Sequence, residues 1–180
     1  AESVYVLINK PLGMVTTVSD DKERLTVMEV VKDIDARLFP VGRLDLDTEG
    51  LLLITNDGTL AHELLSPKKH VTKTYFAKVQ GRVTREDVQR FSLGLDIKEE
   101  KPTLPATLVI EKSDDISEIR VSITEGKYHQ VKRMFEAVGK QVLFLKRLSM
   151  GTLQLDESLT PGSYRALTTE ELSALKNRTI

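Results

Sequence analysis

The sequence has no cysteine among its 180 residues. This absence excludes disulfide bonds and thiolate metal sites, and it leaves the redox state of the compartment unspecified. Aromatic residues are also scarce, at 5% of the chain, although hydrophobic residues reach 40%. That hydrophobic content suffices for a packed core, and the length suits one domain or two closely joined lobes.

Long apolar runs are missing too, because none approaches the roughly 18 residues that a membrane-spanning helix needs. Residues 1–3 put no basic flank before the apolar residues 4–8, so no signal peptide is predicted. The three histidines, at positions 62, 70 and 129, lack metal-ligand spacing. We therefore expect a cytoplasmic protein with no metal site and no membrane partner, and we expect a monomer.

The net charge of −1 excludes a uniformly basic nucleic-acid binder, but the charges are segregated along the chain. Residues 68–85 contain six Lys or Arg and no acid, and residues 126–147 contain six against one glutamate. Residues 94–118 reverse the balance, with seven acids and three lysines. Such segregation can present a basic face to phosphates, although each basic run alone is typical of ordinary solvated surface.

Residues 41–58 carry the most informative pattern. A polar, charge-dense loop at 42–50 runs directly into an apolar strand at 51–55, and an Asn-Asp-Gly turn at 56–58 ends it. Arg43 lies close to Asp45 in sequence, and a nearby cation favours the ionised carboxylate. An ionised carboxylate can act as a base or a nucleophile. Asp47 and Asp57 are alternative carboxylates that the pattern alone leaves open.

This segment resembles the signature loop of the bacterial ribosomal-RNA pseudouridine synthases of the RsuA/RluB/RluE/RluF family. The matching residues are Gly-Arg-Leu-Asp at 42–45, Thr-Glu-Gly-Leu-Leu-Leu at 48–53 and Thr-Asn-Asp-Gly at 55–58. The resemblance implies that Asp45 is the catalytic aspartate, with Arg43 and Leu44 in contact with the substrate. It further implies a pseudouridine synthase fold in which two α/β lobes share one sheet across a central cleft.

The resemblance extends over nearly the whole chain, so we expect residues 1–180 to form the catalytic domain. Many relatives carry a small RNA-binding S4 domain before it, and we expect no S4 domain here because the sequence begins directly at the catalytic strand.

A second segment of the resemblance is Thr72 to Tyr75, where Lys73 precedes Tyr75 by two residues at the entry to a strand. In the family, the tyrosine stacks on the target uracil and takes part in proton transfer, and Tyr75 has the ring and the hydroxyl for both. The alternative for Tyr75 is a core tyrosine on a strand.

A third segment, at 125–135, resembles the family's motif in which a hydrophobic residue and then a basic residue begin a helix. The basic residue forms an ion pair with the catalytic aspartate. Counting along the chain gives Val131 and Lys132, although relatives often have arginine at the latter position and Arg133 is the alternative. The remaining residues assigned to substrate binding in this segment are Lys127, His129 and Gln130.

Periodicity and turn signals predict an α+β fold with a largely antiparallel sheet. Strands are expected at 4–8, 51–55, 74–79, 106–111, 118–124, 142–148 and 152–155. Helices are expected at 26–38, 59–65, 84–91, 129–138 and from 168 onward, two of them opened by capping boxes.

The resulting hypothesis is an isomerase that converts a uridine of ribosomal RNA to pseudouridine and needs no cofactor. Small-subunit 16S rRNA, or a partly assembled small ribosomal subunit that contains it, is the predicted substrate, because Tyr-His-Gln at 128–130 resembles the RsuA branch. Branches directed to 23S rRNA usually have Asn-Arg-Gln there, and 23S rRNA is the alternative. A metal-dependent nuclease or phosphotransferase would need more clustered carboxylates. A non-catalytic RNA-binding module would explain the basic runs but not the signature loop.

Overall fold

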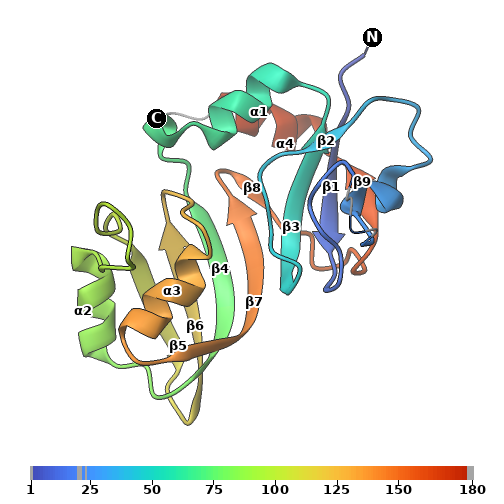
Figure 1. Ribbon diagram of the computed structural model, residues 1–180. Coiled ribbons are helices and arrows are strands. Elements are labelled where there is room, and N and C mark those ends of the chain that lie inside the picture. Colours follow the sequence, from blue (N-terminus) through green and yellow to red (C-terminus); the bar gives the residue numbers. More distant parts are fainter. Residues whose placement is uncertain (1, 20–21, 23, 178–180) are drawn as a thin grey trace. The chain divides into compact units, whose positions relative to one another are not determined.

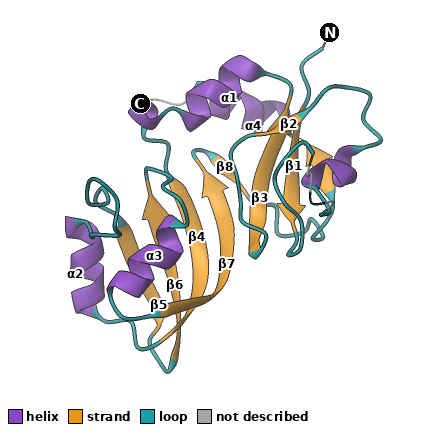
Figure 2. Ribbon diagram, viewed as in Figure 1, coloured by secondary structure: helices purple, strands orange, loops and turns teal. Residues whose placement is uncertain are grey.

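The computed structural model describes residues 2–19, 22 and 24–177 (Figure 1). The chain forms two compact units. The first unit joins the two ends of the chain, Ala1–Val71 and Arg147–Ile180, and the second is the continuous middle segment Thr72–Lys146. Figure 2 shows that each unit combines strands with helices.

The first unit contains the strands β1 (Tyr5–Lys10), β2 (Phe39–Pro40), β3 (Thr48–Thr55), β8 (Leu153–Gln154) and β9 (Tyr164–Ala166). Its helices are α1 (Gly58–Leu65) and α4 (Thr169–Lys176), with two short 3-10 helices at Val27–Val31 and Pro67–Lys69. The second unit contains the strands β4 (Lys73–Gln80), β5 (Thr107–Lys112) and β6 (Ile116–Ile123) and the helices α2 (Arg85–Leu93) and α3 (Gln130–Ala137). Strand β7 (Gln141–Met150) runs from the second unit into the first.

In the first unit the strand order is β7-β3-β1-β9. Strand β1 is antiparallel to β3, with Leu7 opposite Leu53 and Lys10 opposite Gly50. Side chains on both faces of this pair are buried, because Leu7 and Ile8 of β1 point to opposite faces and are both 0% exposed, as are residues 51–54 of β3. One of the two faces packs on the apolar stripes of α1 and α4, through Leu60, Leu64 and Leu175. The end of β1 is thereby fixed next to the start of β3.

In the second unit the order is β5-β6-β4-β7. Strand β6 is antiparallel to both β4 and β5. Ile119, Val121 and Ile123 are buried, as their alternation with polar residues predicts. Helices α2 and α3 contact each other through Phe91 and Phe135, whose ring centroids are 4.9 Å apart, and Figure 1 shows α3 in front of the strands of this unit.

The predicted α+β class is confirmed. Both predicted capping boxes are present, with Thr84 paired to Asp87 at the start of α2 and Thr168 paired to Glu171 at the start of α4. Strands β5 and β6 form a hairpin. Gly139 follows α3 as its C′ residue, with φ +76 and its N–H donating to the main-chain oxygen of Glu136.

The predicted helix at 26–38 is wrong. Only Val27–Val31 is helical, in the 3-10 form, and the chain then becomes irregular and ends in the short strand β2. Three of those five residues are valine, which lowers helix propensity, and Val15 forms a bridge to Thr26 that draws the segment toward the preceding loop. The apolar side chains are still buried at Val27 and Val31, so the periodic pattern reported burial and not a long helix. Strand β9 was not predicted.

Candidate functional site

The signature loop connects the end of β2 to β3, and the strand begins at Thr48, three residues before the predicted start. Position 50 in β3 requires a glycine. Its φ is +113, and a Cβ added there would lie 2.2 Å from the main-chain oxygen of Arg147 on β7. Any side chain would push β3 away from Arg147. The Nε of Arg147 donates to the oxygen of Leu51 at 3.0 Å, which fixes the two segments together.

Lys10, at the end of β1, binds the main chain of the signature loop through its buried ammonium. Its side chain is 0% exposed. The Nζ donates to main-chain oxygens: Thr48 at 2.6 Å, Asp45 at 3.0 Å and Pro11 at 3.0 Å, with Leu46 at 3.5 Å. A buried ammonium that binds several carbonyls of one loop fixes the path of its backbone. The main chain of Asp45 is therefore set by a residue 35 positions earlier in the chain.

Burial lowers the pKa of Lys10 from 10.5 to about 8, against the opposing attraction of the carboxylates of Asp45, Asp47 and Glu49. This role of Lys10 was not predicted from the sequence. The available signal was a single lysine at the end of an apolar strand, which does not by itself distinguish a buried amine from a solvated one.

The loop that follows β1 holds the other side of the signature loop. The hydroxyl of Thr16 donates to the oxygen of Leu44 at 3.1 Å and accepts from its N–H at 3.2 Å. The N–H of Gly13 donates to the oxygen of Leu46 at 3.0 Å. Between these anchors the side chain of Asp45 is half-buried and that of Arg43 is exposed. The side chain of Leu44 is 5% exposed, so it anchors the loop in the core.

Asp57 has a structural task. Its Oδ1 accepts the N–H of Leu60 at 3.1 Å and caps α1, and its Oδ2 accepts the hydroxyl of Tyr5 at 2.5 Å. These hydrogen bonds, above all the one from Tyr5, lower the pKa of Asp57. The geometry therefore removes Asp57 from the three candidate carboxylates.

In the second unit, Tyr75 lies near the start of β4 opposite Val121 of β6 and is 9% exposed. It points to the same buried face as Ala77 and Val79, because side chains alternate along a strand. Lys73 lies two residues earlier, and its Nζ donates to the main-chain oxygen of Glu125 at 3.3 Å. The predicted pair of lysine and tyrosine is therefore present at the entry to the strand.

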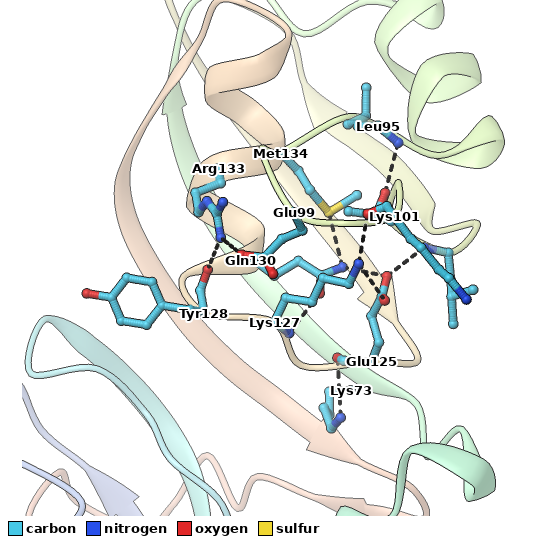
Figure 3. Close-up of polar contacts among 12 residues, drawn as sticks. Lys73, Leu95, Glu99, Lys101, Glu125, Lys127, Tyr128, Gln130, Arg133 and Met134 are labelled. Carbon is cyan, nitrogen blue, oxygen red and sulfur yellow. Dashed lines mark hydrogen bonds and ion pairs between the residues drawn. The ribbon is translucent and has the colours of Figure 1, made fainter.

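The turn before α3 is organised by Gln130, whose side chain is 4% exposed. Its Oε1 accepts the N–H of Lys127 at 3.0 Å, and its Nε2 donates to the Glu125 carboxylate at 3.0 Å (Figure 3). The same carboxylate accepts the N–H of Leu104 at 2.6 Å. The Nζ of Lys127 donates to the main-chain oxygen of Lys101 at 3.0 Å. Gln130 thus supports the turn from within the protein.

Arg133 joins the same network from the next turn of α3. Its guanidinium donates to the Glu99 carboxylate at 2.9 Å, to the main-chain oxygen of Tyr128 at 3.0 Å and to the main-chain oxygen of Ile97. Val131 is buried and Lys132 is half-buried on the helix. Because the donors of Arg133 are used inside the second unit, Lys132 is the better candidate for the motif's cation.

The site residues divide between the units: Asp45, Arg43 and Leu44 belong to the first, and the other predicted residues belong to the second. Within the described residues, no group of three or more His, Cys, Asp or Glu side chains is placed to hold a metal ion. In the same part of the chain no helix is long and apolar enough to cross a membrane.

Comparison with known proteins decides the family. The family model described as RNA pseudouridylate synthase matches residues 4–137. The chain belongs to the RNA pseudouridine synthase family. Its sequence is 49% identical over 177 residues to an uncharacterized RNA pseudouridine synthase, YtzG, of Bacillus subtilis, with 97% of this chain and 74% of the relative covered. The predicted relationship to the RsuA/RluB enzymes and the predicted class of enzyme, an isomerase, are both confirmed.

Two further relatives have names that specify a target. The chain is 42% identical to the ribosomal large subunit pseudouridine synthase B of Bacillus subtilis, over 97% of this chain and 72% of the relative. It is 41% identical to the ribosomal small subunit pseudouridine synthase A of Salmonella typhimurium, over 95% of this chain and 73% of the relative. These identities are nearly equal, so they do not separate the two branches.

A solved crystal structure of a pseudouridylate synthase superposes with a TM-score of 0.87 at 40% identity, covering 97% of this chain and 74% of that one. A complex of Cbf5 and Nop10 from an archaeal box H/ACA particle shares the fold at a TM-score of 0.61 with only 18% identity, over 88% of this chain and 51% of that chain. The pseudouridine synthase fold is therefore shared with distant proteins.

Proposed function

We propose that this pseudouridine synthase acts on a uridine of ribosomal RNA and that Asp45 is its catalytic carboxylate. The observation that carries the proposal is the signature loop, in which Asp45 is half-buried on a backbone held by the buried ammonium of Lys10. A catalytic side chain needs a supporting structure that fixes its position, and this loop has one.

The reaction is an isomerisation within one nucleotide. The bond between N1 of the uracil and C1′ of the ribose breaks, the base rotates, and a bond between C5 and C1′ forms. The hydrogen of C5 is released as a proton and N1 gains one, so atoms and electrons balance without an oxidant, a reductant or a leaving group. Asp45 begins the reaction in one of two ways. Either it adds to C1′ as the bond to N1 breaks, and the bond from Asp45 to C1′ then breaks when C5 attacks C1′, or it removes the C2′ proton as the bond to N1 breaks and returns that proton when C5 joins C1′.

The other roles follow the family's motifs. We assign Tyr75 to the target uracil, through its ring and its hydroxyl, and Lys132 to the cation that favours the ionised carboxylate. Arg43, Lys73, Lys127 and His129 are assigned to the RNA. Leu44, Gln130 and Val131 are buried, so we assign them to supporting the residues that touch it.

We further propose small-subunit rRNA as the substrate. The support is the Tyr-His-Gln sequence at 128–130, which resembles the RsuA branch. A large-subunit enzyme is 42% identical to this chain, which makes 23S rRNA the second candidate.

The test uses unmodified 16S and 23S transcripts and small ribosomal particles, each incubated with the protein, followed by mapping of pseudouridine at single-nucleotide resolution. We expect one modified position in 16S rRNA. Modification confined to 23S rRNA would overturn the choice of target, and no pseudouridine in any of these RNAs would overturn the assignment to ribosomal RNA.

A further inference from the structure

The turn that leads into α3 presents one aromatic side chain to solvent. Tyr128 is 73% exposed. The other tyrosines and phenylalanines of the chain, all within the described residues, are buried or half-buried. A single exposed apolar residue is common and needs no explanation by itself, so the question is how this ring is held.

The ring of Tyr128 stacks on the imidazole of His129, with centroids 3.8 Å apart and ring planes inclined by 19°. His129 is half-buried, so Tyr128 is the outer member of the pair. Because the imidazole covers one face of the phenol ring, the large exposure of Tyr128 belongs to the edges and to the opposite face. One flat π-face, of the width of a nucleobase, is therefore open to solvent.

The backbone that carries this ring is held firmly. His129 has φ 49 and ψ 39, the left-handed conformation, which costs a non-glycine residue roughly 1 kcal/mol or more and persists only where the surroundings impose it. The oxygen of Tyr128 accepts from Arg133 at 3.0 Å, and Arg133 is itself held by Glu99. The preceding N–H, of Lys127, is bound by Gln130. Figure 3 shows the ring of Tyr128 pointing away from this network.

This arrangement suits an unpaired base of an RNA strand. A ring fixed in advance loses little conformational freedom when a base stacks on it. Lys127 adjoins Tyr128 in the sequence and adds positive charge close to the ring, which attracts the adjoining phosphates. In a duplex each base is already stacked on both faces, whereas an unpaired base can place one face on an aromatic side chain.

We propose that Tyr128 is a stacking platform for one unpaired nucleobase of the substrate RNA, other than the uridine that reacts, and that His129 supports the ring from behind. The proposal rests on the proposed function, since it names a further contact of the same enzyme with its RNA. It assigns base contact to Tyr128 and gives His129 a positioning role in addition to its proposed contact with the RNA.

The chain has no tryptophan, so the variant Tyr128→Trp would contain a single tryptophan, which can be excited selectively and which keeps an aromatic face at this position. We expect single-stranded oligoadenylate to quench its emission by stacking, and we expect the same strand paired with oligouridylate to quench it far less. Leu93→Trp is the control, because Leu93 lies on α2 in the same unit and is 82% exposed. Equal quenching in the two variants, or equal quenching by the duplex, would overturn the proposal.

The second arm measures steady-state kinetics on whichever rRNA transcript the wild type modifies. Tyr128→Ala should raise KM by about 5- to 150-fold, as expected for the loss of one stacked base, while kcat stays within about twofold. Tyr128→Phe should keep KM within about twofold of wild type, since the ring remains, and so should Leu93→Ala. An unchanged KM in a folded Tyr128→Ala variant would refute the platform. If the wild type modifies no transcript, the proposed function fails, and the fluorescence arm still decides whether a base stacks on this ring.

Discussion

The signature loop and the turn before α3 both carry predicted site residues, but they are held in opposite ways. The signature loop is bound from the interior by one ammonium, that of Lys10, which binds main-chain oxygens. The turn before α3 is bound partly by the buried Gln130 and partly by side chains that reach the surface, among them the ion pair of Arg133 with Glu99, in which the side chains are 22% and 39% exposed. Each arrangement has its own sensitivity to mutation, salt and pH.

The buried ammonium of Lys10 is shielded from mobile ions, and because it binds main-chain oxygens its contacts do not depend on the side chains of the loop. A half-exposed ion pair is screened by salt and contributes little free energy by itself. The signature loop, proposed for bond cleavage, is therefore held rigid by buried contacts. In the turn before α3, proposed for RNA contact, the polar network extends to the solvent. The following predictions test this difference, from the largest expected effect to the smallest.

Asp45→Asn should reduce the rate of pseudouridine formation by on the order of 10⁴-fold, because the change keeps the shape and removes the reacting charge. Thermal unfolding should stay close to wild type, since the hydrogen bond from Lys10 to the main chain at this position remains. Asp47→Asn is the matched control in the same loop and should lose much less activity. Near-normal turnover in a folded Asp45→Asn protein would remove Asp45 from the mechanism.

Lys132→Met should slow turnover by about 100-fold if this lysine is the cation of the motif. Arg133→Met is the neighbouring control. It should chiefly lower stability, by about 1–2 kcal/mol, because it releases Glu99 and the carbonyls of Ile97 and Tyr128. Rate measurements and unfolding curves on both variants decide between them. Loss of turnover in Arg133→Met alone would identify Arg133, and not Lys132, as the cation of the motif.

Lys10→Met should lower the free energy of unfolding by about 2–4 kcal/mol, because it leaves carbonyls of Asp45 and Thr48 buried without a donor. It should also lower kcat, as the loop that carries Asp45 loses its support. Denaturant unfolding and kinetics measured on the same preparation test both effects. A variant with normal stability and normal kcat would contradict this role of Lys10.

The pH dependence of Lys10 sharpens this test. Its pKa of about 8 in the folded chain lies below the ordinary 10.5. Between these values the unfolded chain binds more protons, so the contribution of Lys10 to the free energy of unfolding rises with pH. Turnover should nevertheless fall above about pH 8, because the neutral amine has one N–H fewer for the carbonyls. Lys10→Met should lose both trends, and identical pH profiles in the two proteins would refute them.

Glu125→Gln should have the smallest effect, about 1 kcal/mol, since an amide oxygen can still accept from Leu104 and Gln130. The loss should shrink further at high salt, unlike that of Lys10→Met. Unfolding curves of the two variants at low and high salt make the comparison direct. An equal response to salt would contradict the distinction between the two regions.

Local sequence signals were sufficient to predict much of the secondary structure of this protein. Alternation showed which face of β6 is buried, and the capping boxes at Thr84 and Thr168 marked two helix starts, because these signals depend on residues only a few positions apart. Residues 26–38 show where prediction from local sequence fails. The periodic apolar pattern indicates which side chains are buried, but in the folded protein the segment forms a short 3-10 helix and then an irregular stretch.

The sequence by itself determined the family, through the gapless signature at 42–58, and with it the choice of Asp45 for chemistry. Only the tertiary structure decided that Lys10 is buried beneath that loop, that Asp57 accepts the hydroxyl of Tyr5 and that Arg133 is engaged with Glu99. The physical reason is distance along the chain. Lys10 and Asp45 are 35 positions apart, and Arg133 and Glu99 are 34 apart. Whether a charged side chain is solvated or bound to such a distant partner depends on how the strands and helices pack, which no local pattern encodes.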